Sequence, residues 1–299
     1  MQEKTQADYR SLATHFYATR LRGLPPSPKR VADALAACSV DYRPAYWRRL
    51  RSALAYDQDR RGYREAAERV RGVENLATKK GLPTKKKQRR VKEISEKDES
   101  KLFDYLGPSG DVELTAAVLM AKYLGVRPAE MMGVRVREDG LIEIRGAKQS
   151  HEGTRGADRV VAVPPAVRAT IAQCVEALRN SPRGLTGVQD RLRRICRDLW
   201  PQRKALPTLY TFRHQLGSDL KAFSMDRVAI AYLMGHQATK SVDQYGDKRR
   251  GRGKPLLQPA AEADFSKIRI NHLASKGLKP AAPEAKTVYD FGFDDSGRR

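Results

Sequence analysis

Apolar residues recur at helical spacing along the first part of the chain. Residues 7–21 place their apolar side chains at i, i+3 and i+4 positions, which is typical of an amphipathic helix. A second helix is predicted to begin at Ser27 and Pro28, since serine caps free N–H groups and proline suits the first helical turn. Further helices are predicted from Pro44 and over 65–71. The pattern therefore predicts a small all-helical domain at 1–73.

The helix predicted from Pro44 has an apolar side and a basic side. The apolar side carries Trp47, Leu50 and Leu54, and the basic side carries Arg48, Arg49 and Arg51. A solvated charged face is the ordinary interpretation of such a side. Acidic residues do not interleave with these arginines, so we favour contact with a DNA backbone.

Residues 74–94 lose the helical period and become basic. Gly81 and Pro83 interrupt any regular element there. The candidate DNA-binding residues of this stretch are Lys85, Lys86, Lys87, Arg89 and Arg90. A nuclear-import signal has the same composition, but nothing else in the chain indicates a nucleus. We expect an inter-domain linker that lies along phosphates.

A second domain is predicted over 95–250. Ser95 caps a first helix, and the nearly apolar stretch 112–124 is predicted to form a helix at the centre of the core. Alternating apolar positions predict two strands, at 141–144 and 160–163. Further helices are predicted at 165–178 and 188–199. The predicted fold is mainly α with a small antiparallel β-hairpin or sheet, in which an N-terminal helical domain precedes an α+β domain.

Three short helices are predicted towards the end of this domain. The first covers 211–222, and the second begins at Ser224 or Asp226 and stops at Gly235, which suits a left-handed turn. A third is predicted to start at Ala238 and to carry Tyr245. A tail at 251–299 follows, with a short helix predicted at 261–273.

The composition indicates a nucleic-acid partner. The net charge is +23 and the pI is about 10.1. Such an excess of lysine and arginine can replace the cations that are condensed on nucleic-acid phosphates. An anionic membrane is the alternative, but the chain has no apolar run near 18 residues and no signal-peptide pattern at its start. Three separated cysteines form no metal-spaced pairs and predict reduced core residues.

Three blocks near the C-terminus carry candidate chemistry. They are Tyr210-Thr211-Phe212-Arg213, Leu233-Met234-Gly235-His236 and, nine positions later, Tyr245. They resemble the C-terminal motif of the tyrosine recombinases, the phage-integrase family, which reads H-x-x-R, L-G-H and then tyrosine at this distance. Tyr210 departs from the pattern, because the family usually has histidine there. His214 lies beside it in the chain and is assigned a supporting role.

Two upstream features extend the resemblance. The segment from Gly125 to Val134 is similar to the family's first arginine block, and it makes Arg127 the catalytic match and Glu130 its supporting acid. Lys148 occupies the place of the family's hairpin lysine. Three arginines near it are further candidates for phosphate contact: Arg145, Arg155 and Arg159.

The resemblance implies a reaction and an assembly. The implied catalytic residues are Arg127, Lys148, Tyr210, Arg213, His236 and Tyr245. Tyr245 would attack a phosphate of duplex DNA and form a 3′-phosphotyrosine link, with the arginines and histidine on the phosphate and Lys148 as general acid. No metal or other cofactor is implied. The partner would be a double-stranded recombination site, bound by a homo-tetramer that is a monomer or weak oligomer without DNA.

Other functions remain open on the sequence alone. One is a DNA-binding protein that keeps the fold without cutting, and another is a type IB topoisomerase or telomere resolvase. A membrane-surface protein is a more distant alternative. For the recombinase, we expect a cytoplasmic, nucleoid-associated protein encoded by a bacterium or a phage.

Overall fold

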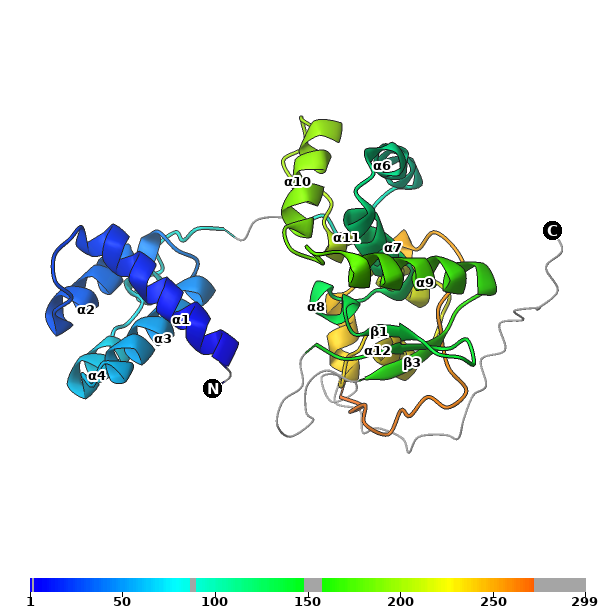
Figure 1. Ribbon diagram of the computed structural model, residues 1–299. Coiled ribbons are helices and arrows are strands. Elements are labelled where there is room, and N and C mark those ends of the chain that lie inside the picture. The colour runs from blue at the N-terminus through cyan, green and yellow to red at the C-terminus, as the bar shows by residue number, and fades with distance from the viewer. Residues whose placement is uncertain (2, 87–89, 148–157, 272–299) are drawn as a thin grey trace. The chain divides into compact units, whose positions relative to one another are not determined.

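The chain folds into two compact units, Met1–Arg89 and Arg90–Arg299, each with its own hydrophobic core (Figure 1). The computed structural model describes residues 1, 3–86, 90–147 and 158–271. Within those ranges, no helix is both long enough and apolar enough to cross a membrane.

The first unit is all-helical, as predicted. Its elements are α1 (Glu3–Phe16), η1 (Tyr17–Leu21), α2 (Pro28–Ala37), η2 (Cys38–Val40), α3 (Pro44–Arg60), α4 (Arg64–Arg71) and α5 (Leu76–Lys79). Ser27 caps α2 by accepting from the Arg30 N–H, and Trp47 is buried in the core. The helix predicted over 7–21 instead begins at Glu3 and changes to a π-helical turn after Phe16. The described residues of the predicted linker include a short helix, α5, whose Ala77 is fully buried.

The helices of the second unit surround one central helix. They are α6 (Glu96–Ser109), α7 (Val112–Leu124), α8 (Pro128–Met131), α9 (Pro165–Asn180), α10 (Val188–Leu199), α11 (Leu209–Ala222), α12 (Arg227–Leu233), η3 (Thr239–Gln244) and η4 (Lys248–Arg250). Helix α7 packs against both α9 and α11, and eight of its thirteen residues are buried. This agrees with its nearly uniform apolar sequence.

A four-stranded antiparallel sheet completes the second unit. The strands are β1 (Val134–Val136), β2 (Ile142–Ile144), β3 (Arg159–Ala162) and β4 (Gln258–Pro259), in the order β1-β2-β3-β4. The predicted strands correspond to β2 and β3, and Ile144 pairs with Arg159. The outer strands β1 and β4 were not predicted.

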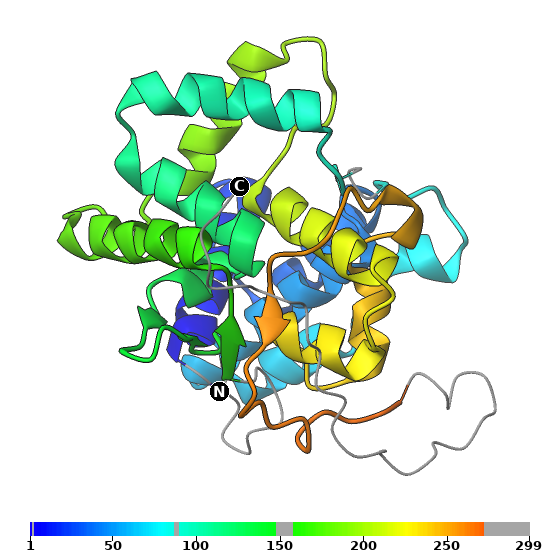
Figure 2. The same ribbon diagram turned by 90° about the vertical axis from the view of Figure 1, so that its right-hand side faces the viewer.

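The prediction of a helix at 261–273 is wrong for its described part. Residues 261–271 form turns and a bridge, and β4 just before them pairs with β3 (Figure 2). Leu257 and Ile268 are buried in the core of the second unit. Residues 251–271 therefore belong to this unit, whereas the rest of the predicted tail, 272–299, lies outside the described residues.

Candidate active site

Arg127 is fixed at the junction between α7 and α8. Gly125 ends α7 in a left-handed conformation, with φ of +59°, and Arg127 is extended just before Pro128 starts α8. The Glu130 carboxylate accepts from the Arg127 backbone N–H at 2.9 Å and also from the Arg127 guanidinium. The predicted support of Arg127 by Glu130 is thus present as an ion pair within one helical turn.

Arg159 binds the same carboxylate from the sheet. Its Nη2 lies 3.1 Å from the Glu130 Oε2, and both side chains are 0% exposed. Burial by itself raises the pKa of the Glu130 carboxyl, but Arg159 and Arg127 outweigh burial and lower that pKa to about 2. The sequence made Arg159 a candidate for phosphate contact together with the exposed Arg145. The structure instead encloses it completely, so it does not reach solvent.

Arg213 projects from α11 into the interior. Its guanidinium donates to the carbonyls of Gly125 and Met234, and its Nη2 lies 3.3 Å from the His236 Nε2. Burial, followed by the charges of Arg127 and Arg159, lowers its pKa to about 9, so it stays charged at neutral pH. Most of its donors are occupied, and its Nε has no partner among the described residues.

His236 follows α12 and is held in a defined tautomer. Gly235 turns the chain with φ of +57°, and the His236 imidazole is 5% exposed. Because a guanidinium only donates, a hydrogen bond between the two requires the His236 Nε2 to accept from Arg213 and the proton to lie on Nδ1. Burial and the three nearby arginines lower the His236 pKa to about 2, which keeps the ring neutral. The His236 Nδ1 is buried and has no hydrogen-bond partner in the described part of the chain.

Tyr245 lies against three side chains of its own chain. Its ring centroid is 4.8 Å from the Arg213 Cζ, 5.0 Å from the His236 ring and 4.8 Å from the His214 ring. The prediction that a helix carries Tyr245 is wrong in detail. The 3₁₀ turn η3 ends at Gln244, and Tyr245 is extended with φ of −123° and ψ of 127°.

One face of α11 holds the backbone that follows Tyr245. The Lys221 ammonium donates to the carbonyls of Tyr245 and Gly246 at 2.6 and 3.0 Å, and the Gly246 N–H points to the His214 Nδ1 at 3.4 Å. The Ser218 hydroxyl accepts from the Asp247 backbone N–H at 3.0 Å. These three side chains recur at i, i+4 and i+7, a helical spacing that would have identified this face in the sequence.

The structure brings together most of the predicted catalytic set. Arg127, Arg213, His236 and Tyr245 lie in one continuous cluster through Glu130 and the Gly235 turn. Tyr210 is half-buried at the start of α11, and no hydrogen bond joins its hydroxyl to the described residues. His214, assigned only a supporting role, contacts Tyr245 directly. Lys148 lies outside the described residues. Among the residues that the structure does describe, no three His, Cys, Asp or Glu side chains cluster as metal ligands would.

The candidate DNA-binding residues differ in their availability. Arg48 is exposed and makes no ion pair with a described residue. Arg49 pairs with Asp8 at 3.2 Å, and Arg51 donates to the Val73 carbonyl at 3.0 Å. The three described candidates of the linker, Lys85, Lys86 and Arg90, are exposed. Lys87 and Arg89 lie outside the described residues.

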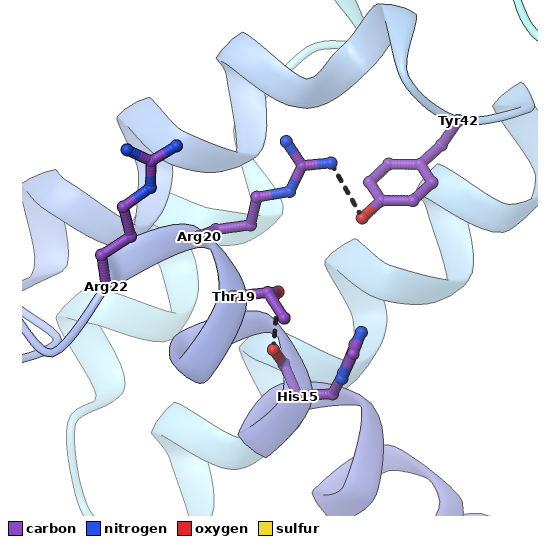
Figure 3. A pocket seen from close by; sticks show the side chains of 5 residues that line it. All are labelled: His15, Thr19, Arg20, Arg22 and Tyr42. Atoms are coloured by element: carbon purple, nitrogen blue, oxygen red, sulfur yellow. Dashed lines mark hydrogen bonds between the residues drawn. The ribbon is translucent and has the colours of Figure 1, made fainter.

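A polar pocket of about 460 Å³ opens on the first unit (Figure 3). It is lined by His15, Thr19, Arg20, Arg22 and Tyr42. Arg20 pairs with Asp41 at 2.7 Å and donates to the Tyr42 hydroxyl at 3.1 Å, whereas Arg22 has no ion pair with any described residue. This pocket adds an exposed guanidinium to the basic surface of the unit.

Comparisons with known proteins identify the fold. No protein-family model and no curated protein matches the sequence. A lambda integrase dimer bound to a COC′ core site is 21% identical, with a TM-score of 0.58 over 83% of this chain and 73% of that one. A lambda integrase tetramer bound to a Holliday junction is 20% identical, with a TM-score of 0.56 over 84% and 74%. The Tn1549 transposon integrase with circular intermediate DNA is 14% identical, with a TM-score of 0.50 over 83% and 90%. The chain therefore has the fold of these integrases, and the predicted fold class is confirmed.

Proposed function

We propose that this chain is a tyrosine recombinase, a site-specific enzyme that cleaves and rejoins duplex DNA. One observation carries the proposal. The Tyr245 ring lies against Arg213 and His236 of its own chain, and these connect to the pair of Arg127 and Glu130. The bound DNA of the lambda and Tn1549 integrases, which share the fold, supports the proposal.

The proposed reaction is a transesterification at one phosphate. The Tyr245 hydroxyl releases its proton to water, its oxygen forms a bond to phosphorus while the bond to the 5′ oxygen breaks, and a proton moves to that leaving oxygen. A neutral phenol is a weak nucleophile, so a cationic environment favours the attack. Arg213 and Arg127 would stabilise the negative charge that develops, and the His236 Nδ1–H would donate to a phosphate oxygen. We propose Lys148 as the general acid, as the family resemblance implies.

The phosphotyrosine link stores the energy of the cleaved bond. Attack by a 5′ hydroxyl on this link reverses the first step, so rejoining needs no nucleotide cofactor. If that hydroxyl comes from a second duplex, strands are exchanged. If it comes from the same duplex, supercoils are relaxed, as a type IB topoisomerase would do. The lambda integrase tetramer on a Holliday junction favours exchange by a homo-tetramer for this chain.

DNA contact is proposed for both units. The exposed Arg22, Arg48, Lys85 and Lys86 of the first unit are available to phosphates, in agreement with the net charge of +23. We propose that this unit serves as a core-binding domain.

A trapping assay tests the proposal. Duplexes covering the flanks of the gene would each carry a nick close to the candidate cleavage point, so that the leaving fragment diffuses away. We expect a covalent complex that survives SDS on one of these duplexes. Binding without any covalent complex would indicate a protein that keeps the fold but does not cut. A two-site exchange assay, compared with relaxation of a single plasmid, then separates a recombinase from a topoisomerase.

A further inference from the structure

Arg159 occupies a position in β3 that faces the core. Along this strand and just after it, Val161 and Val163 face the same way and are buried. A charged residue in such a row is costly unless it is paired. The Arg159 side chain is nevertheless 0% exposed, and its guanidinium is paired with the Glu130 carboxylate.

Its neighbours hold Arg159 beside the cluster around Tyr245. The Tyr232 hydroxyl bonds the Val160 N–H at 2.9 Å and the Val160 carbonyl at 3.2 Å, which anchors β3 to α12. The Arg159 Nη1 then lies directly against Gly235, where a Cβ would approach it to 2.6 Å. Gly235 therefore has to be glycine both for its φ of +57° and for this contact.

The cluster has a surplus of positive charge. Three arginines, Arg127, Arg159 and Arg213, share one carboxylate, that of Glu130, and the His236 ring is neutral. Two positive charges therefore remain without a counter-ion among the described residues. In the same region, the Arg159 Nε and Nη1, the Arg213 Nε and the His236 Nδ1 lack hydrogen-bond partners in the described part of the chain. Buried donors and charges of this kind favour an anion as ligand.

We propose that Arg159 is a third cationic residue of the phosphate site, a positioning residue that acts through Glu130 and the Gly235 turn. The inference rests on the proposed function. By sharing Glu130, Arg159 prevents that carboxylate from cancelling the charge of Arg127. Arg159 also raises the net charge of the cluster from +1, with Arg127, Arg213 and Glu130 alone, to +2. A DNA phosphodiester carries one negative charge, whereas the five-coordinate phosphorane carries two. Arg159 therefore stabilises the transition state more than the bound substrate.

Two substitutions at Arg159 separate its charge from its shape. Arg159→Gln removes the charge and keeps a donor for Glu130, and Arg159→Lys keeps the charge. Arg135→Met, at an exposed position of β1, is the matched control for loss of a positive charge from the sheet. Cleavage is measured on a nicked duplex that the unmodified protein cleaves, and again on the same duplex with a methylphosphonate at the cleaved position. A methylphosphonate lacks one negative charge.

We expect Arg159→Gln to cleave the phosphodiester more slowly by about tenfold or more, with duplex affinity changed by less than about twofold. Arg159→Lys should recover most of the rate, and Arg135→Met should cleave normally. On the methylphosphonate the deficit of Arg159→Gln should largely disappear, since less charge needs to be stabilised. If Arg159→Gln does not fold, Arg159→Met is compared in the same way.

Two results would overturn the proposal for Arg159. One is an Arg159→Gln variant that cleaves at the normal rate. The other is an equal deficit on both substrates, which would mark Arg159 as a structural residue only. Failure of the unmodified protein to cleave any duplex would instead contradict the proposed function.

Discussion

The imidazole of His214 stacks on the phenol ring of Tyr245, with ring centroids 4.8 Å apart and planes inclined by 28°. The preceding residue of α11, Arg213, places its guanidinium 4.8 Å from the centre of the same ring. Two successive residues of one helix therefore contact the proposed nucleophile. Helix α11 both supplies the charge and positions the phenol.

The contact between His214 and Tyr245 predicts an effect on cleavage as well as on stability. His214→Ala removes the ring stack and the acceptor for the Gly246 N–H, two interactions worth about 1 kcal/mol each. We expect cleavage to fall by roughly tenfold on a nicked duplex. His214→Gln, which retains an acceptor, should lose less. Normal cleavage by His214→Ala would show that Tyr245 is positioned without it.

Tyr210 tests the departure from the family motif. A phenol at this position can donate a hydrogen bond to phosphate, so Tyr210→His should keep substantial activity. Tyr210→Phe should lose about 0.5–3 kcal/mol of transition-state stabilisation. Cleavage rates of both variants on the nicked duplex provide the measurement. Full activity in Tyr210→Phe, together with an inactive His214→Ala, would assign the role to His214 instead.

Gly246 controls how closely the chain after Tyr245 approaches α11. It has φ of +69°, and a Cβ there would collide with the backbone of Gly217 and Ser218. Gly246→Ala should displace the segment and slow cleavage by about tenfold or more, while affinity for the duplex stays nearly unchanged. Gly253→Ala is the matched control, since a Cβ there meets no atom within 4 Å. Equal cleavage by the two variants would contradict this account of the segment.

Local signals predicted the helices well. The cap at Ser27 and the nearly apolar stretch of α7 each depend on neighbouring residues, and the structure bears them out. Of the two candidate caps for α12, Ser224 and Asp226, Asp226 is the one that accepts from the helix N–H groups. The order and spacing of Arg213, His236 and Tyr245 likewise indicated that they converge.

Features that depend on distant segments were not predictable. The burial of Arg159 depends on its ion pair with Glu130, which is 29 positions earlier in the chain. From the sequence alone, an arginine in a strand is expected to be exposed. The extended conformation of Tyr245 depends on contacts with Lys221 and His214 rather than on the residues around it. Strand β4 is only two residues long, and it forms because β3 provides a partner.

The two buried histidines predict that the protein becomes less stable as the pH is lowered. Burial, and then nearby positive charges, lower the pKa of His214 to about 4 and that of His236 to about 2, from an ordinary value of 6.5. The unfolded chain therefore binds these protons first. The free energy of unfolding should fall as pH drops below 6.5, by up to about 1.4 kcal/mol per pH unit for each histidine. The loss from His214 should end near pH 4.

Urea unfolding between pH 7 and pH 5 measures this dependence. His214→Gln should reduce the slope, since it removes one of the two linked protons. Glu130, with its pKa lowered to about 2 from 4.5, adds a further loss only below about pH 4.5. Stability that does not change between pH 7 and pH 5 would contradict the buried, neutral state of both rings.

The salt dependence of DNA binding tests the role of the first unit. Arg48 is exposed and unpaired among the described residues, so Arg48→Ala should lower the slope of log affinity against log salt by about 0.9. Arg71 is bound to Asp59 and Glu68, and Arg71→Ala should leave the slope nearly unchanged. An unchanged slope in Arg48→Ala would show that this arginine does not contact phosphate.

The identity of the residue that becomes linked to DNA tests the central claim most directly. After trapping on the cleaved duplex, nuclease digestion and mass spectrometry locate the nucleotide on a peptide of the protein. We predict a 3′-phosphate ester on Tyr245, and a Tyr245→Phe variant that binds the duplex but forms no SDS-stable complex. A nucleotide on another residue, or a covalent complex formed by Tyr245→Phe, would contradict the claim that Tyr245 is the nucleophile.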